Sequence, residues 1–420
     1  MIEFMEAFAN MARVKHVVSK IGSGKTPAGG SEAYPEEGVV FLRSQNIHFG
    51  GLRLEDVAYI SEETHREMEN TRLVEGDVLL NITGASIGRV ARFPKGIGEA
   101  NVNQHVCILR PTGSVDSRFL EYALSAYTTW AQILSLQAGG NRDGLNFEQV
   151  GDLRIPTPAI DTQRRIADFL DAETVRIDEL VAKRRQMRDL LILKRARIVE
   201  NVLGLDNIQR RNNFVPLKYL VESVTVGIVI TPAKWYVDIG GVPALRGLNI
   251  QAGAIDASDL VYISRAGHLE NQKSRLHSGD VVVVRTGQAG TAAVVPPELD
   301  GANCIDLILV RPGEKVSPQY LQYVLNSDYA KNHISEHSVG SIQAHFNISS
   351  MKQIPIPEMS RAEQQRVTDI LDGLTAQIDS LYAKLTKQEA LLSEHRQALI
   401  TAAVTGQFDV SLASGRGVEE

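Results

Sequence analysis

The sequence has few of the residues that mark extracellular, membrane-bound or metal-binding proteins. Among its 420 residues are only two cysteines, Cys107 and Cys304, too few for a disulfide framework or a cysteine-rich metal site. The N-terminus has no basic region followed by an apolar core. The longest apolar runs, such as residues 281–284, are much too short to cross a bilayer. We therefore expect a cytoplasmic protein with no membrane partner.

The sequence also lacks the common catalytic and cofactor-binding patterns. Residues 22–26 (GSGKT) superficially resemble a phosphate-binding loop, but Ser19 stands where that loop needs its first glycine, and Pro27 interrupts the following helix. No Asn/Asp-Pro-Pro-aromatic element or metal-dependent nuclease signature is present. We therefore predict a protein that is not an enzyme and binds no metal or cofactor itself.

The net charge is only weak evidence against a nucleic-acid partner. The formal net charge is −6 at pH 7, whereas a protein that binds nucleic acid on its own is usually basic. Binding depends on local patches, and a partner can supply positive charge. With 43% hydrophobic residues, the chain is long enough for two to four domains with proper cores.

The main positive feature is an internal repeat. Residues 42–47 (LRSQNI) correspond to 245–250 (LRGLNI), with an offset of 203 positions. The offset drifts to 201 at Arg110-Pro111, to 199 at Ile155-Pro156, and returns to 201 at residues 168–171. Such drifts indicate two copies of one fold with loop insertions. The period is far too long for a solenoid.

Each copy mixes strand and helix patterns, which predicts an α+β fold. Strand-like runs occupy 39–42, 78–80 and 105–109 in the first copy, with 281–284 and 306–310 in the second. Helical stretches cover 117–135 and 318–335. The predicted division is an N-terminal tail (1–14), domain 1 (15–158), helical spacer 1 (159–205), a linker (206–214), domain 2 (215–357), helical spacer 2 (358–406) and a C-terminal tail (407–420).

An Ile-Pro-X-Pro element closes each domain, and a long heptad pattern follows it. The pattern predicts two antiparallel coiled-coil helices, each about 60 Å long at about 1.5 Å per residue, which would act as a ruler. The predicted seam residues are Ile166, Leu170, Ile177, Leu180, Leu191, Val367, Leu371, Leu374, Ile378, Leu381, Leu385 and Leu392. On the outer faces, Arg176, Arg184, Arg185 and Arg188 are either solvated or face a partner.

The elements at the domain exits resemble those of type I restriction–modification specificity subunits. They are residues 155–158 (IPTP) with 163–166 (QRRI) and 170–171 (LD), and residues 354–357 (IPIP) with 363–367 (EQQRV) and 371–372 (LD). The first copy departs from the family pattern at Thr162, where glutamate is usual. The resemblance implies two target-recognition domains, each followed by a conserved helical region.

The same resemblance implies a non-catalytic subunit that reads a bipartite, asymmetric sequence in double-stranded DNA. Each recognition domain would read one half-site, and the helices would set the gap. Two methyltransferase subunits using S-adenosylmethionine to methylate adenine are implied partners. Two motor-nuclease subunits requiring ATP and Mg²⁺ are further implied partners. Competing interpretations are a coiled-coil scaffold that joins two ligand-binding domains, and a fragment of a fused methylase.

Comparing the copies suggests residues that contact DNA. Residues shared by both copies are expected to serve the fold or the DNA backbone, and polar loop residues that differ are better candidates for base readout. The shared candidates are Arg43, Asn46, Arg246 and Asn249. The differing candidates are Ser44, Gln45, Asn81, Asn141, Arg142, Arg285, Ser341, Gln343 and His345.

Overall fold

A computed structural model describes residues 10–27, 34–137, 144–205, 213–336 and 347–412. Its contacts divide the chain into two units, residues 1–185 with 386–420, and residues 186–385. Each unit contains one repeat together with a segment of both long helices, α6 (Ile160–Leu203) and α11 (Arg361–Val404). These helices lie within the predicted ranges of 159–205 and 358–406.

In the first unit, the recognition domain is built on a four-stranded antiparallel sheet of order β2-β10-β7-β8. A second sheet, β6-β3-β9, has one antiparallel and one parallel pairing, and two short ladders join β4 to β5 and β1 to β11. The strands are β1 (Met11–Arg13), β2 (Val18–Ser23), β3 (Val39–Leu42), β4 (Ile47–His48), β5 (Gly51–Leu52), β6 (Ala58–Ile60), β7 (Val78–Asn81), β8 (Val90–Arg92), β9 (Ala100–Val102), β10 (Val106–Pro111) and β11 (Arg154–Pro156). The domain helices are α2 (Glu62–Glu67), α3 (Ser117–Ser125), α4 (Tyr127–Gln137) and α5 (Phe147–Asp152).

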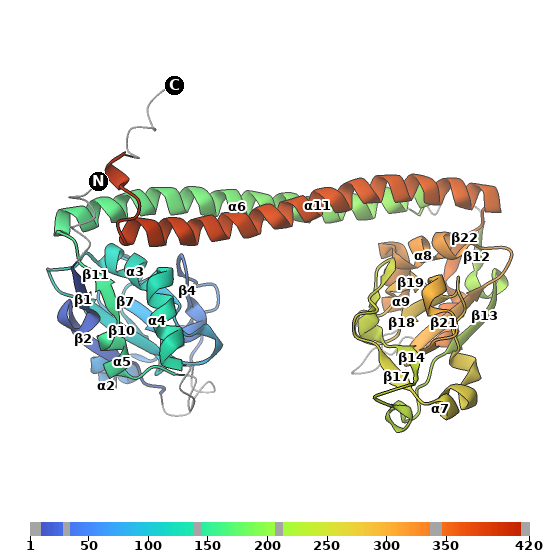
Figure 1. Ribbon diagram of the computed structural model, residues 1–420, viewed down its shortest axis with the longest axis horizontal. Helices are drawn as coiled ribbons and strands as arrows, with labels where there is room; N and C mark the ends of the chain where they lie inside the picture. The colour runs from blue at the N-terminus through green and yellow to red at the C-terminus, as the bar shows by residue number, and fades with distance from the viewer. Residues whose placement is uncertain (1–9, 28–33, 138–143, 206–212, 337–346, 413–420) are drawn as a thin grey trace. The chain divides into compact units, whose positions relative to one another are not determined.

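The second unit repeats this topology strand for strand, as sheets β13-β21-β18-β19 and β17-β14-β20 with ladders β15-β16 and β12-β22. Figure 1 shows α3 over the first domain's sheet and α8 over the second domain's sheet. The strands are β12 (Phe214–Pro216), β13 (Val221–Val226), β14 (Val242–Leu245), β15 (Ile250–Gln251), β16 (Ala254–Ile255), β17 (Val261–Ile263), β18 (Val281–Val284), β19 (Ala292–Val294), β20 (Asn303–Cys304), β21 (Leu307–Pro312) and β22 (Pro355–Pro357). The domain helices are α7 (Arg265–Glu270), α8 (Pro318–Asn326), α9 (Asp328–Glu336) and α10 (Ile348–Gln353).

The structure differs from the predicted tail and from both predicted domain helices. Residues 11–13 form β1, which pairs with β11, so this part of the predicted N-terminal tail belongs to domain 1. The helices predicted over 117–135 and 318–335 are each broken by one extended residue, Ala126 and Ser327. In domain 1 the break lets two short helices reach the same core, α3 through Phe119 and α4 through Ile133.

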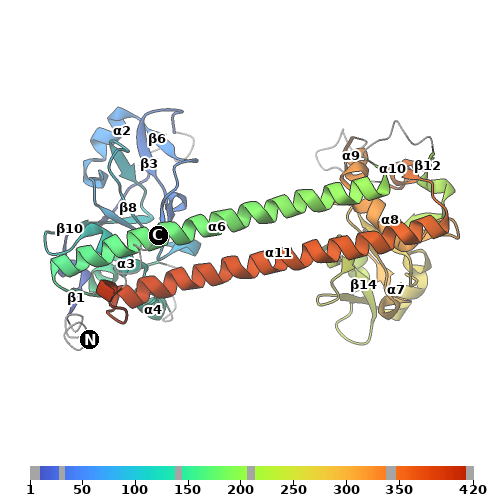
Figure 2. The ribbon, with the colours of Figure 1, turned by 90° about the horizontal axis from the view of Figure 1, so that it is seen from above.

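Within each unit, α6 and α11 run antiparallel, as predicted (Figure 2). In the first unit Asp178 pairs with Arg396 at 3.1 Å and Arg185 pairs with Glu389 at 3.6 Å, so the partner's number falls as the residue number in α6 rises. In the second unit Arg195 pairs with Asp379 at 3.0 Å. Asp379 and Arg396 are the repeat equivalents of Asp178 and Arg195, at an offset of 201. The same ion pair is therefore present in both units.

The predicted seam residues differ in their burial. Six of the predicted residues are buried: Ile166, Leu170, Ile177, Leu371, Ile378 and Leu385. Leu191, Val367 and Leu392 are half-buried. Leu180, Leu374 and Leu381 are 38%, 36% and 49% exposed, so their assignment to the seam is wrong. At every second seam position, the residue that faces inward is the one that follows the predicted position. These inward residues are largely polar and are buried or half-buried: Thr174, Arg188, Arg195, Thr375, Glu389 and Arg396.

Each domain is joined to its helix by a glutamine that bonds only to backbone. Gln163 accepts from the Asp116 N–H at 2.9 Å and donates to the Pro158 carbonyl at 2.8 Å. Gln364 accepts from the Ser317 N–H at 2.7 Å and donates to the Met359 carbonyl at 2.8 Å. Both glutamines are buried. This joint fixes where the helix leaves each domain.

Candidate nucleic-acid interface

The shared arginine and asparagine near the start of each copy stabilise a turn. In domain 1 the Asn46 side chain accepts from the Arg43 N–H at 2.9 Å and donates to the Arg53 carbonyl at 2.9 Å. The Arg43 guanidinium donates to the Asp56 carbonyl at 3.1 Å. These bonds fix the 3₁₀ turn Ser44–Asn46 and the following β4–β5 hairpin.

Domain 2 repeats the arrangement. The Asn249 side chain accepts from the Arg246 N–H at 2.8 Å and donates to the carbonyls of Asp256 and Asp259 at 3.1 and 3.0 Å. Asn46 and Asn249 are only 2% and 1% exposed, so neither amide is available to a base edge. Both asparagines bond within their own domain, which does not favour them as DNA-contact candidates.

The differing candidates that the structure describes differ in how far they are exposed. Asn81 is fully buried and donates to the Ser44 carbonyl at 2.8 Å, so it also holds the turn, and its assignment to base contact is wrong in this conformation. Gln45 is exposed and donates to the Asp56 carboxylate at 2.8 Å, and Ser44 is half-buried. Arg285 is held by Asp306 at 2.7 Å with 19% of its side chain exposed. Five candidates lie outside the described residues: Asn141, Arg142, Ser341, Gln343 and His345.

In the glycine-rich stretch at residues 22–26, the backbone at Gly24 passes very close to the backbone at Val102, the last residue of β9. A Cβ atom at Gly24 would lie 1.6 Å from the Val102 carbonyl oxygen, and one at the equivalent Gly227 would lie 2.4 Å from the Cys304 carbonyl oxygen. Only glycine allows the backbones to approach this closely. The Gly24 N–H is itself bonded to the Asn103 carbonyl at 3.1 Å. Gly22 and Ser23 belong to β2, and residues 24–27 lie in neither a helix nor a strand.

A tyrosine and an aspartate tie each domain to its helix. Tyr122 donates to Asp171 at 2.8 Å, and the equivalent Tyr323 donates to Asp372 at 2.6 Å. Burial raises the pKa of both phenols, that of Tyr323 to about 12, so both hydroxyls carry their protons at neutral pH. Both aspartates are one turn from the equivalent threonines, Thr174 and Thr375.

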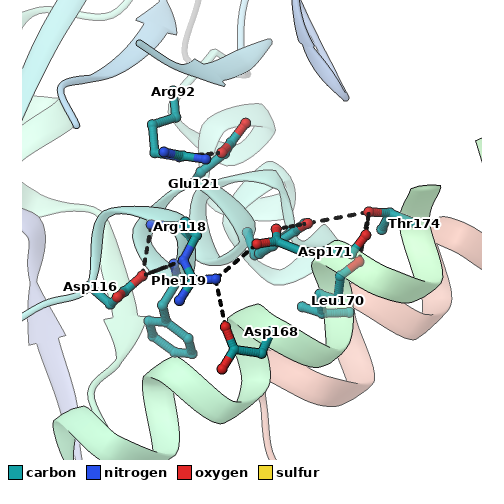
Figure 3. Close-up of polar contacts among 10 residues, drawn as sticks. Arg92, Asp116, Arg118, Phe119, Glu121, Asp168, Leu170, Asp171 and Thr174 are labelled. Carbon is teal, nitrogen blue, oxygen red and sulfur yellow. Dashed lines mark hydrogen bonds and ion pairs between the residues drawn. The ribbon is translucent and has the colours of Figure 1, made fainter. Parts of the chain in front are cut away.

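Domain 1 has an additional ionic anchor. The Arg118 guanidinium lies among Asp116, Asp168 and Asp171, at 3.5, 2.6 and 3.0 Å (Figure 3). Domain 2 has glutamine, Gln319, at the equivalent position although both helix carboxylates, Asp369 and Asp372, are retained. The first recognition domain is therefore held to its helix by charges that the second lacks.

Exchanging these two residues should shift the stability of each domain in opposite directions. We expect Arg118→Gln to destabilise domain 1 by about 1 kcal/mol, because the network is partly exposed and screened by solvent. Gln319→Arg should stabilise domain 2 by a similar or smaller amount, because Asp369 and Asp372 are the equivalents of the two helix aspartates that pair with Arg118. Urea unfolding of the full chain measures both effects, and unchanged midpoints in both variants would contradict the anchor.

The long helices carry exposed apolar residues at equivalent places in the two units. Leu180 and its equivalent Leu381 are 38% and 49% exposed, and Leu190 and its equivalent Leu391 are 57% and 52% exposed. Leu180 and Leu391 lie in the first unit, and Leu381 and Leu190 lie in the second. Each unit thus presents the same two leucines, one from each helix. None of the described helices is long and apolar enough to cross a membrane.

A family model described as the type I restriction modification DNA specificity domain matches residues 14–186 and 246–389, one match in each repeat. The matches cover more than half of the chain, which therefore belongs to this family.

Similar proteins include the StySPI specificity subunit of a type I restriction enzyme from Salmonella potsdam. It is 32% identical over 186 residues, which are 42% of this chain and 39% of that protein. The EcoKI specificity subunit of Escherichia coli K12 is 29% identical over 176 residues, 40% of this chain and 36% of that protein. The matches thus span about two fifths of the length of these two relatives.

The fold is also known from solved structures. A chain from a structure concerned with the complex assembly and conformational transition of the type I R-M system has a TM-score of 0.73 at 16% identity. The alignment covers 95% of this chain and 98% of that one. The HsdS subunit from Thermoanaerobacter tengcongensis has a TM-score of 0.51 at 17% identity, with 95% and 97% covered. At these identities the likeness establishes the fold.

Proposed function

We propose that this chain is the subunit that gives a type I restriction–modification complex its DNA sequence specificity. Each recognition domain reads one half of a bipartite, asymmetric site in double-stranded DNA, and α6 and α11 set the gap between the halves. The observation that carries this proposal is a duplicated fold of conserved topology whose exposed polar residues differ between the copies. A protein that read a palindrome would have no need of two different readers.

Exposed residues on the long helices support the proposal that two copies of one partner bind this chain. Large apolar residues at equivalent exposed positions in both units suit two copies of one partner, because a duplicated surface offers two equivalent sites. Two methyltransferase subunits fit this requirement. S-adenosylmethionine would be bound by these partners, and ATP and Mg²⁺ by two motor-nuclease subunits. This chain would be non-catalytic, would bind no cofactor itself and would act in the cytoplasm.

The direct experiment is to co-express the chain with the adenine methyltransferase that we expect to be encoded beside it and to map methylated adenines across a genome. A bipartite motif with two unlike halves is expected. Replacing residues 15–158 with the recognition domain of a relative should change one half only. If no bipartite motif appears, the chain would instead be a coiled-coil scaffold joining two ligand-binding domains.

A further inference from the structure

A polar contact that is the same in both domains serves the fold that they share. A polar contact that differs between the domains is not needed by that fold. A buried histidine–asparagine pair illustrates the first kind. His65 bonds to Asn101 at 2.5 Å, and the equivalent His268 bonds to Asn303 at 2.6 Å. The contact has the same chemistry and geometry in both domains, so we attribute it to the fold.

One polar cluster occupies the same place in both domains but differs in chemistry. It lies where β7 ends and β10 begins, and at the equivalent ends of β18 and β21. In domain 1 Thr83 bonds to His105 at 2.6 Å, and Gln104 bonds to His105 at 3.1 Å. In domain 2 the equivalents of Gln104 and His105 are Ile305 and Asp306.

In domain 2 the cluster is ionic. Asp306 accepts from Arg285 at 2.7 Å and from Thr286 at 3.5 Å. Thr286 is the equivalent of Thr83, and each threonine precedes a glycine with positive φ, 70° at Gly84 and 77° at Gly287. The turn and its threonine are therefore constant, and the side chain that the threonine contacts is what changes.

The backbone at Asp306 gives a second, independent observation. Its φ of 50° lies in the left-handed region, which is less favourable for aspartate than for glycine, although aspartate adopts it more readily than most other residues. The equivalent His105 has no positive φ, and it ends a connection of three residues after β9, whereas Asp306 ends a connection of two residues after β20. Strained residues of this kind are concentrated at functional sites. The Asp306 side chain is 45% exposed, Gln104 is exposed and His105 is half-buried.

The side chains are of the types that read base edges. Arginine donates two hydrogen bonds to guanine, glutamine bonds to adenine in the same bidentate manner, and an aspartate accepts from cytosine. A histidine–glutamine pair and an arginine–aspartate pair present different patterns of donors and acceptors. Two such patterns at one place in a repeated fold are what two unlike half-sites require.

We infer that Gln104 and His105 in domain 1, and Arg285 and Asp306 in domain 2, are specificity-determining residues that contact base edges of the two half-sites. The inference rests on the proposed function and assigns it to named residues. The variable pair is presented by a constant threonine turn, so the bases read can change while the fold does not.

Asp306→Gly is the sharpest test, because glycine removes the carboxylate and relieves the left-handed strain, so the variant should remain folded. It is to be co-expressed with the methyltransferase and its methylated motif mapped. We expect about a 10- to 100-fold loss of discrimination at a base of half-site 2, with half-site 1 and the gap unchanged. Gln104→Ala combined with His105→Asn should relax half-site 1 only.

Arg66→Gln is the matched control, because Arg66 is exposed on α2 of domain 1, where its guanidinium donates to the Glu62 carbonyl at 3.2 Å. It should leave both half-sites unchanged. If the wild-type chain gives a bipartite motif and both cluster variants keep it unaltered, the inference is overturned while the proposed function stands. A wild-type chain that gives no bipartite motif overturns the proposed function itself.

Discussion

Replacing Arg110 with methionine should open domain 1 and leave domain 2 closed. Asp77 is fully buried, and its carboxylate accepts two bonds from Arg110, both at 2.8 Å. Removing one partner of a buried ion pair leaves an uncompensated charge, which costs about 3–5 kcal/mol, and the 31% exposure of the Arg110 side chain places this pair toward the lower end of that range. The equivalent Arg311–Asp280 pair, at 3.0 and 2.9 Å, makes the same prediction for Arg311→Met in domain 2.

The two cysteines report on each domain separately. Cys107 lies in β10 of domain 1 and Cys304 in β20 of domain 2, and both are fully buried. Burial raises the pKa of each thiol to about 12, so labelling requires the domain to open. Mass spectrometry after pulsed alkylation therefore measures two opening equilibria in one chain.

We expect Arg110→Met to accelerate labelling of Cys107 by about two to four orders of magnitude, the equivalent of about 3–5 kcal/mol, with Cys304 unaffected. Arg311→Met should do the reverse. Arg164→Ala is the control, since its pair with Asp161 is exposed on both sides and should contribute at most about 1 kcal/mol. Equal labelling of Cys107 in the Arg110 and Arg164 variants would refute the buried-pair argument.

Deleting one heptad from each long helix should shorten the gap between the half-sites by about three base pairs. Residues 181–187 and 382–388 are equivalent, and removing both keeps Asp178 opposite Arg396 and Arg195 opposite Asp379. Seven residues correspond to about 10.5 Å of helix at about 1.5 Å per residue, or about three base pairs at about 3.4 Å each.

The methylated motif of the deletion variant measures the effect. Both half-sites should be unchanged while the gap is shorter. Deleting residues 181–187 alone is the control, because it shifts one helix against the other by seven residues and mismatches the ion pairs, so methylation should be lost. An altered half-site combined with an unchanged gap would contradict the ruler.

Much of the fold could be predicted from the repeat and from local pattern. The strands around 39–42, 78–80 and 281–284 lie where apolar runs end in glycine turns, and the helix ranges follow from the heptads. The seam was only partly predictable, because the inward residues at every second seam position include Thr174, Arg188 and Glu389, whereas exposed leucines such as Leu381 carry the stronger apolar signal. Polar residues can line a seam when ion pairs across it satisfy them.

The interface was harder to predict than the fold. Asn46 and Asn81 are residue types that often contact bases, but here their amides bond to backbone that is distant in sequence, which no local pattern reveals. Arg285 was found because it differs between the copies. His105 and Asp306 differ in the same way, and a search for unlike polar residues next to the shared Thr-Gly turns would have found them.

The glutamine joints have a consequence for how such a protein diversifies over evolutionary time. Gln163 and Gln364 bond to backbone groups of their domains, so a recombined domain that keeps the chain path and the tyrosine that bonds to the helix aspartate can make the same joint. Crossovers near these joints can exchange one reader without disturbing the other. With each domain reading one half-site, as we propose, a lineage would acquire a new DNA target in a single recombination event.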